Sequence, residues 1–348
     1  MATIRSISDF GLSIGTLPSG PLRRISDVPG VTVGHETIDT PIHKTGVTVI
    51  LPGEGTPFLQ KYIAACYVLN GFGKTTGLAQ IEELGTLETP IALTNTLNVG
   101  LVQDGLIEYV IAQCAQEHYT PSSINAVVGE CNDARLNQIT RRAVTKEHVF
   151  SAIRRREKAF MMGDVGAGKG TLCYGWKGGI GSASRKITIG GKTYTLGVLV
   201  QSNYGHPDDL QLLGRKIPPP DPITSQPSQD KGSIMMVLAT DLPVDARQLQ
   251  RILKRMSVGM ARLGSYIGHG SGEIMIGFTT ANPIAHISQK DLFPFSFLRE
   301  DLLDIAFRAA GESCEEAIVT SMLCADGVVG YQGVLAQSLG SYLQNHSF

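Results

Sequence analysis

The sequence lacks the excess of positive charge that nucleic-acid-binding proteins carry. Its 348 residues include 30 Lys and Arg and 31 Asp and Glu, which gives a formal net charge of −1, and neither sign forms a long run. Binding to phosphate backbones normally requires a basic patch or stripe. We therefore expect no nucleic-acid partner.

Long apolar runs are also missing. No run approaches the roughly 20 apolar residues that a membrane-spanning helix needs, and residues 1–10 lack the apolar core of a secretory signal peptide. Apolar residues still make up 42% of the chain, which is enough for a substantial core. We expect a cytoplasmic protein with no membrane contact, built either as two domains or as one large multilayer domain.

Cysteine and histidine are sparse and scattered. The six cysteines form no C-x-x-C pair, and none of the eight histidines lies four residues from another. Metal sites are usually built from such pairs. The sequence therefore predicts reduced, mostly buried thiols, with no metal and no cofactor.

Glycine, by contrast, is abundant, and two glycine motifs suggest chemistry that their context does not support. Residues 163–169 match a phosphate-binding loop, but Gly170 stands where Ser or Thr must hold magnesium, and no helix is predicted to follow. Around Ser271, His269 and Glu273 occupy the positions where a nucleophile elbow needs glycine. We interpret these glycines as structural and disfavour an α/β-hydrolase.

Hydrophobic periodicity predicts a mixture of strands and helices. Strands are predicted within residues 30–51 (a hairpin-like pair), 89–100, 125–133, 193–201, 233–240 and 273–280. Helices are predicted at 58–69, from residue 101, at 147–158, from a capping box at 245–248 as far as 263, and at 302–324. The strands at 89–100 and 125–133 end in polar loops, a common place for binding groups.

The composition of the sequence changes from polar and proline-rich to apolar at the bond between Gly232 and Ser233. Residues 215–231 are rich in Pro and polar side chains and are typical of a linker, whereas residues 234–240 form an apolar run of strand length. A serine at this position is ordinarily just the first residue of a strand. The residues alone leave that interpretation open.

The motifs around this bond resemble a known family. Lys-Gly-Ser-Ile-Met-Met-Val-Leu-Ala-Thr-Asp at 231–241, with Gly-Ser-Gly-Glu at 270–273, is similar to the DmpA/BapA family of self-processing aminopeptidases. Matching motifs at 27–35, 178–185 and 201–205 extend the resemblance over nearly the whole chain.

The resemblance implies a fold and a maturation step. The fold would be a single four-layer αββα sandwich, similar to N-terminal-nucleophile hydrolases and ornithine acetyltransferases. The protein would cut its own Gly232–Ser233 bond to give an α chain of residues 1–232 and a β chain of residues 233–348. Such αβ pairs would assemble as a tetramer.

The resemblance also assigns roles to individual residues. Ser233 matches the nucleophile, and Ser271 and Glu273 match the serine and acid that assist it. Once freed, the α-amine of Ser233 would itself serve as a base, because an α-amino group has a pKa of roughly 7.7–8.0. Without the resemblance, Glu273 is simply a carboxylate at the start of a strand.

Three further residues complete the implied site. Asn203 matches the donor to the oxyanion, although it also suits a turn before Tyr-Gly. Glu130 matches the acid that binds the free amine of the substrate. Asn132 stands where some relatives carry Tyr, and Asp133-Ala-Arg-Leu replaces a more usual Asp-Gly, so the sequence does not predict the side chain that the substrate-facing loop accepts.

The implied reaction is hydrolysis of N-terminal residues from short peptides, amides or esters through an acyl-enzyme on Ser233, with β-amino or D-residues as possible substrates. One alternative is an acyltransferase of the ornithine acetyltransferase type, although that group typically uses Thr as nucleophile. The other is an inactive binding scaffold that keeps the fold.

Overall fold

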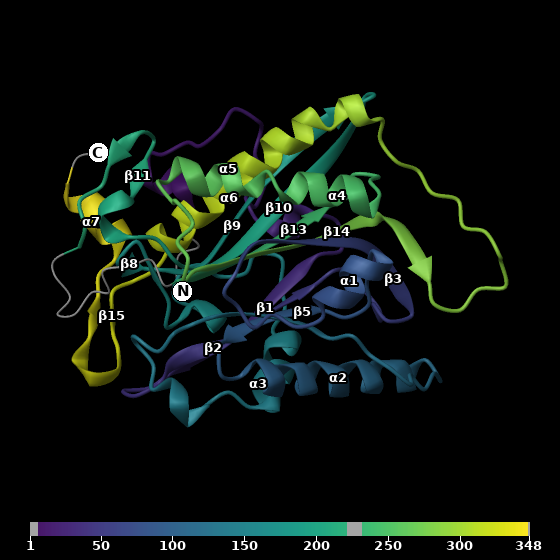
Figure 1. Ribbon diagram of the computed structural model, residues 1–348, viewed down its shortest axis with the longest axis horizontal. Coiled ribbons are helices and arrows are strands. Elements are labelled where there is room, and N and C mark those ends of the chain that lie inside the picture. The colour runs from purple at the N-terminus through teal and green to yellow at the C-terminus, as the bar shows by residue number, and fades with distance from the viewer. Residues whose placement is uncertain (1–5, 221–231, 347–348) are drawn as a thin grey trace.

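The computed structural model describes residues 6–220 and 232–346 and has four layers (Figure 1). Two β-sheets stack face to face in the middle, and helices cover the outer face of each sheet. This is the αββα arrangement that the motifs implied. One helical layer holds α4 (Ala246–Leu253), α5 (Met256–Arg262) and α6 (Asp304–Leu323), and the other holds α2 (Val99–Gln116) and α3 (Lys146–Arg154).

The larger sheet has the strand that begins at Ser233 near its centre. Across the sheet the strand order is β4 (Thr86–Leu87), β3 (Gln60–Gly71), β14 (Gly272–Ala285), β13 (Ser233–Thr240), β10 (Lys192–Asn203) and β9 (Gly179–Ile189). Strand β13 pairs in parallel with β14 and antiparallel with β10. All eight residues of β13 are buried, as expected for a continuous apolar run covered on both faces.

The smaller sheet lies beneath it. Its strands, in order, are β1 (Thr32–Asp39), β2 (Lys44–Leu51), β5 (Ile91–Asn95) and β6 (Val127–Cys131). The remaining elements are α1 (Leu78–Leu84), α7 (Leu339–Asn345) and the two-stranded pairs β7 (Leu172–Cys173) with β8 (Trp176–Lys177), β11 (Gln211–Leu212) with β12 (Arg215–Lys216), and β15 (Val328–Val329) with β16 (Leu335–Ala336).

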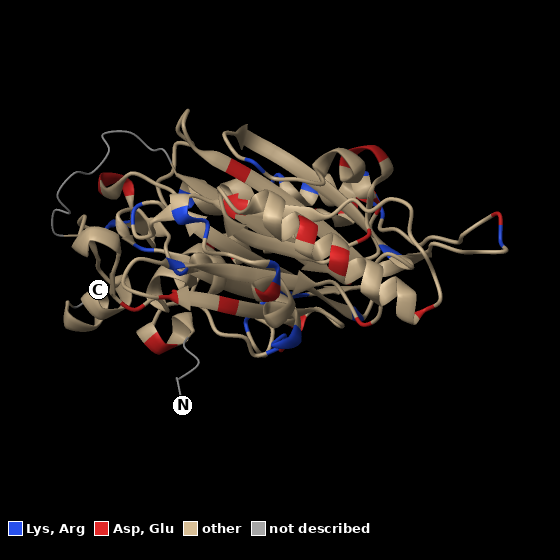
Figure 2. Ribbon diagram, turned by 90° about the horizontal axis from the view of Figure 1, so that it is seen from below, with Lys and Arg blue, Asp and Glu red and all other residues tan. Residues whose placement is uncertain are grey.

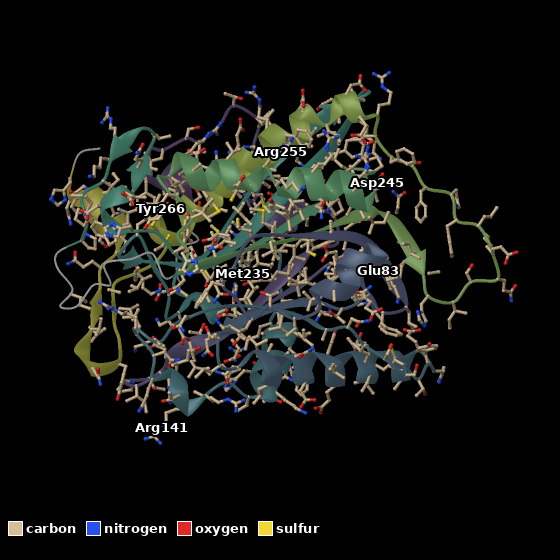
Figure 3. The ribbon with its side chains drawn as sticks, in the orientation of Figure 1. Glu83, Arg141, Met235, Asp245, Arg255 and Tyr266 are labelled. Carbon is tan, nitrogen blue, oxygen red and sulfur yellow. The ribbon has the colours of Figure 1, made fainter. Side chains whose placement is uncertain are left out.

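Alternating side chains of β13 serve the two faces of its sheet. Met235 and Val237 pack in the cluster between the two sheets, and Met235 is labelled there in Figure 3. Ile234 and Met236 pack on the opposite face, in the cluster that includes the helical layer. By the same alternation Ser233 shares the face of Met235 and is directed toward the smaller sheet.

The predicted helix at 58–69 is wrong, because this segment is the strand β3. Its apolar residues do recur at helical spacing, but the residues between them are apolar as well. Ala64 and Cys66 pack between the sheets, whereas Ala65 belongs to the cluster on the helical side. A strand buried on both faces has no clean period of two, so spacing alone misidentifies it.

The helix predicted to run from the capping box to residue 263 is two helices. Its start is confirmed, since the Asp245 side chain accepts a hydrogen bond from the Gln248 N–H, but the helix ends at Leu253 and α5 begins at Met256. The predicted apolar stripe is nevertheless buried on both sides of the break.

Four other expectations concern the chain as a whole. All six cysteines are free and buried, as predicted. Within residues 6–220 and 232–346, no helix is long and apolar enough to cross a membrane. Lys and Arg are scattered over the ribbon among Asp and Glu (Figure 2). Of the predicted linker, residues 215–216 form β12, and residues 221–231 lie outside the described residues.

Candidate active site

Ser233 lies where two strand ladders end. In the register of the sheet it pairs with Asn203 at the end of β10 and with Gly272 at the start of β14. A Cβ atom on Gly272 would lie 2.5 Å from Phe72 O and 3.3 Å from Ser233 Oγ, so a side chain here would clash with the Phe72 carbonyl and would also crowd the Ser233 hydroxyl. Strand pairing thus brings together residues 203, 233 and 272, which are far apart in the sequence.

The peptide carbonyl before Ser233 is held by a backbone donor. The Gly272 N–H donates a hydrogen bond to Gly232 O at 3.1 Å. At Gly232 itself a Cβ atom would lie 2.0 Å from Asn203 O, so a side chain does not fit without a backbone shift. The Gly272 N–H could not be predicted from the sequence, because a backbone donor has no signature in residue types.

Ser271 and Glu273 form a buried pair beside this junction. Both are fully buried, and Ser271 Oγ donates a hydrogen bond to Glu273 Oε1. The turn that leads into β14 is fixed by Asn70, whose Nδ2 donates to Gly268 O at 2.8 Å and also to Ser271 O. Asn70 was not predicted, because its role depends on the pairing of β3 with β14 and not on its own neighbours.

The amide of Asn203 has a defined orientation. Its Oδ1 accepts a hydrogen bond from the Leu172 N–H at 3.0 Å. This contact fixes which side of the amide presents oxygen and therefore which side presents the NH2 donor. A donor held in one orientation is what stabilisation of an oxyanion requires.

Glu130 lies at the end of β6 and is 3% exposed. Its carboxylate accepts hydrogen bonds from the Lys74 N–H at 3.2 Å and from the Thr96 hydroxyl. A Cβ atom on Gly73 would lie 3.8 Å from Glu130 Oε1 and 2.9 Å from Ile274 Cδ1. The segment 72–74 therefore runs between the carboxylate and the start of β14.

The direct contact between β6 and the nucleophile position is made by Cys131. Its Sγ lies 3.3 Å from Ser233 O and 3.3 Å from Gln201 O, and the two carbonyls share the single proton of the thiol. Glu130, one residue earlier, points away from this contact by strand alternation. The Glu130 carboxylate lies against segment 72–74 on its own side of β6.

Asn132 is exposed and forms a turn. Its Oδ1 accepts a hydrogen bond from the Ala134 N–H at 3.0 Å, a local contact typical of Asn at the start of a turn. The next residue, Asp133, is fully buried, and its Oδ1 accepts from Asn137 Nδ2 at 2.9 Å. The loop after β6 therefore has one solvent-facing and one buried polar side chain.

Burial raises the pKa of Asp133 to about 6, against the lowering effect of hydrogen bonds from Thr45, Asn137 and Asn95. Between the ordinary pKa and this value the folded protein binds one proton more than the unfolded chain, so its stability falls as pH rises from about 4 to 6. We expect Asp133→Asn to remove this slope. Relative to wild type, the variant should gain up to roughly 3 kcal/mol across that interval.

Urea denaturation at pH 4, 5, 6 and 7 measures this effect. The exposed Asp104 on α2 provides the matched control, and Asp104→Asn should follow wild type at every pH. Parallel stability curves for wild type and Asp133→Asn would show that burial does not control this carboxyl group.

The glycine-rich segment has the structural role that the sequence predicted. Gly166–Gly168 form a short 3-10 turn, and the strand β7 follows instead of a helix. A Cβ atom on Gly163 would lie 2.2 Å from Cys324 O, so the backbone packs too closely here for a side chain. Among the described residues, no three His, Cys, Asp or Glu side chains are grouped so that they could hold a metal ion.

Comparison with known proteins identifies the family. The model of peptidase family S58 matches residues 23–336. The chain belongs to peptidase family S58. The resemblance found in its motifs is confirmed, and with it the expectation of a hydrolase of the aminopeptidase type.

Individual proteins match this chain over most of their length. β-Peptidyl aminopeptidase BapA of Sphingosinicella xenopeptidilytica is 34% identical over 92% of this chain and 85% of its own. The PH0078 protein of Pyrococcus horikoshii OT3 has a TM-score of 0.89 and 41% identity, with 98% of both chains covered. The L-aminopeptidase D-Ala-esterase/amidase of Ochrobactrum anthropi, described as a variant of the Ntn hydrolase fold, has a TM-score of 0.87 and 32% identity, again over 98% of both chains.

Proposed function

We propose that this S58 peptidase activates itself by cutting the Gly232–Ser233 bond and then removes N-terminal residues from short peptides, amides or esters. The observation that carries the proposal is the environment of the Gly232 carbonyl and the Ser233 hydroxyl. The Gly232 carbonyl already accepts a hydrogen bond from the Gly272 N–H, and Gly272 leaves space beside the Ser233 hydroxyl.

In the self-cleavage step, Ser233 Oγ attacks the carbonyl carbon of Gly232. The Gly272 N–H supports the negative charge that develops on the carbonyl oxygen. The C–N bond then breaks, the nitrogen takes a proton and becomes the α-amine of Ser233, and an ester links Gly232 to Oγ. Water hydrolyses this ester, which leaves the Gly232 carboxylate and a free Ser233 hydroxyl.

In turnover the same hydroxyl attacks the substrate. The Ser233 α-amine accepts the hydroxyl proton directly or through Ser271, and Glu273, bonded to Ser271, stabilises the ammonium that forms. The Asn203 NH2 donates to the oxyanion, and the acyl group on Oγ is then released by water. A carboxylate at Glu130 pairs with the free amine of the substrate and restricts cleavage to the first residue.

The experiment that tests this function is a denaturing gel with intact-mass measurement on the purified protein. We expect two fragments whose masses correspond to residues 1–232 and 233–348. The cleaved protein should release p-nitroaniline from amino-acid p-nitroanilides. A chain that stays intact after long incubation would contradict the self-cleavage.

The role of Glu130 is tested by Glu130→Gln. We expect KM for a p-nitroanilide with a free amine to rise by about 10- to 100-fold, since a hydrogen bond to a charged group contributes about 1.5–3 kcal/mol. Glu83, exposed on α1 and labelled in Figure 3, provides the matched control, and Glu83→Gln should leave KM unchanged. An unchanged KM in Glu130→Gln would remove this residue from the substrate site.

An acyltransferase of the ornithine acetyltransferase type remains a second candidate, because the acyl-enzyme on Ser233 accepts an amine as readily in principle as water. Adding an excess of an amine acceptor separates the two functions by product. A hydrolase releases mainly the free acid, whereas a transferase releases mainly the new amide. A folded protein that cleaves none of the p-nitroanilides would instead support the inactive scaffold.

We propose β-amino or D-residues among the substrates, since the relative from Sphingosinicella is named a β-peptidyl aminopeptidase and that from Ochrobactrum a D-Ala-esterase/amidase. We also propose a tetramer of αβ pairs acting in the cytoplasm. Six buried, free thiols suit a reducing compartment. Light scattering on the cleaved protein measures the assembly.

A further inference from the structure

A lysine with no part in the reaction described above is completely buried close to the site. Lys177 lies on β8 and is 0% exposed. Burying an ammonium is costly unless all its protons find acceptors, and an apolar side chain of similar length usually packs at lower cost. A buried lysine at this position is therefore expected to make hydrogen bonds that an apolar side chain could not make.

The ammonium of Lys177 binds backbone carbonyls only. Its Nζ donates to Gly168 O at 2.9 Å, Thr171 O at 2.9 Å and Gly178 O at 2.8 Å. These three contacts use all three of its donors. Because two of the acceptors lie within residues 168–171, the ammonium fixes the shape of this turn.

The turn held by Lys177 leads directly to the residue that orients Asn203. Lys177 pairs across the β7–β8 hairpin with Leu172, and the Leu172 N–H donates to Asn203 Oδ1 at 3.0 Å. The Thr171 carbonyl also accepts from the Gly178 N–H at 3.0 Å, which closes the hairpin around the ammonium. A continuous set of hydrogen bonds thus connects Nζ to the amide of Asn203.

We propose that Lys177 is a positioning residue for Asn203: its ammonium holds the turn 168–171, so that Leu172 keeps the Asn203 amide with its NH2 toward the reacting carbonyl. The proposal rests on the function proposed above, in which Asn203 donates to the oxyanion. Loss of the ammonium removes one donor from each of three buried carbonyls. Thr171 O keeps the Gly178 N–H and Gly168 O keeps the Thr171 hydroxyl, but the link through Nζ that joins these carbonyls is lost, so the turn can shift. A displacement of even about 1 Å at an oxyanion donor reduces the rate without changing how the substrate amine binds.

Burial lowers the pKa of Lys177 to about 7, with the nearby Asp164 opposing this effect. The three contacts favour the charged form, because an ammonium has a proton for each carbonyl whereas a neutral amine could donate to only two of them. The pKa indicates how strongly the protein interior disfavours the charge and thus how much the three carbonyls must compensate.

The test is a double-mutant cycle of Lys177→Met and Asn203→Ala, with kcat and KM measured on a p-nitroanilide that wild type cleaves. The kcat is calculated per cleaved chain, as counted on a denaturing gel. We expect Lys177→Met to lower kcat by about 10- to 100-fold with KM within about threefold. Asn203→Ala should lower kcat by about 10²- to 10³-fold.

The decisive value is the effect of Lys177→Met in the Asn203→Ala background. If Lys177 acts through Asn203, adding Lys177→Met to Asn203→Ala lowers kcat by less than about threefold, because the group that Lys177 positions is already absent. If the two losses multiply, Lys177 acts independently of Asn203 and the proposal is overturned. An unchanged kcat in Lys177→Met overturns it as well.

Two further results keep this test separate from folding and from the proposed function. Lys177→Gln retains two donors and replaces Lys177→Met if the latter does not fold; if neither gives a folded protein, Lys177 is a folding residue and the proposal is rejected. If Asn203→Ala itself leaves kcat unchanged, the oxyanion assignment has failed and the role of Lys177 fails with it. Lys186 on β9 of the larger sheet is the matched control, because its Nζ donates to Thr195 Oγ1 at 2.9 Å, and Lys186→Met should keep kcat within about twofold.

Discussion

Replacing Ser233 by Ala should give a folded protein that is one intact chain of 348 residues with no aminopeptidase activity. The substitution removes the Oγ that attacks Gly232 and, since no cut occurs, it also withholds the α-amine that serves as base. Loss of a nucleophile typically reduces kcat by about 10⁴-fold or more. Intact-mass measurement and p-nitroanilide hydrolysis test the two consequences separately.

The fold should survive this change. Alanine is smaller than serine and removes only the hydroxyl oxygen, so it fits the space that Ser233 occupies, and thermal unfolding of Ser233→Ala should resemble that of wild type. Ser257 on α5 provides the control for the loss of one hydroxyl, because it lies in the helical layer, where its Oγ donates to Lys254 O at 2.6 Å. A Ser233→Ala protein that is still cut between residues 232 and 233 would assign the nucleophile elsewhere.

Glu273→Gln should produce the second-largest loss. The glutamine side chain retains the shape and an oxygen that can accept from Ser271, but it lacks the negative charge that stabilises an ammonium at Ser233. Removing one member of an acid–base pair usually lowers kcat by about 10²- to 10⁴-fold. We also expect part of the protein to remain uncut, since self-cleavage uses the same groups.

Glu117, exposed at the end of α2, is the matched control for the loss of one carboxylate. Glu117→Gln should match wild type in kcat and in the extent of cutting. A Glu273→Gln enzyme within about threefold of wild-type kcat would show that the charge is not required. It would leave Ser271 and the Ser233 amine as the only proton carriers in the scheme.

The strand that begins at Ser233 was predictable because its signal is local. A polar, proline-rich segment gives way within two residues to an apolar run of strand length, and the observed β13 has the predicted bounds. The four-layer fold was predicted from the resemblance of motifs along the chain to those of the DmpA/BapA family. In contrast, β3 was predicted as a helix, because a strand buried between two layers shows no period of two that would distinguish it.

The parts of the site that the sequence did not predict are those made by long-range or backbone contacts. Asn70 acts through the pairing of β3 with β14, and the Gly272 N–H acts through the pairing of β13 with β14. Lys177 was visible only as part of a glycine-rich motif, and nothing in its neighbours indicates three carbonyl partners. The roles of Ser233, Ser271, Glu273, Asn203 and Glu130 remain predictions, for which the geometry provides the means of testing.

The strand order of the larger sheet determines what becomes of the protein after a cut at residue 232. Strands β13 and β14 would belong to the second fragment, yet they lie between β3 and β10 of the first. Neither fragment can leave without exposing unpaired strand edges on both sides, so the pair should remain associated until the whole sheet unfolds. Refolding of the cleaved protein then requires two separate chains to associate. Refolding of the mature enzyme should therefore depend on concentration, whereas the uncut Ser233→Ala chain should refold at a rate independent of it.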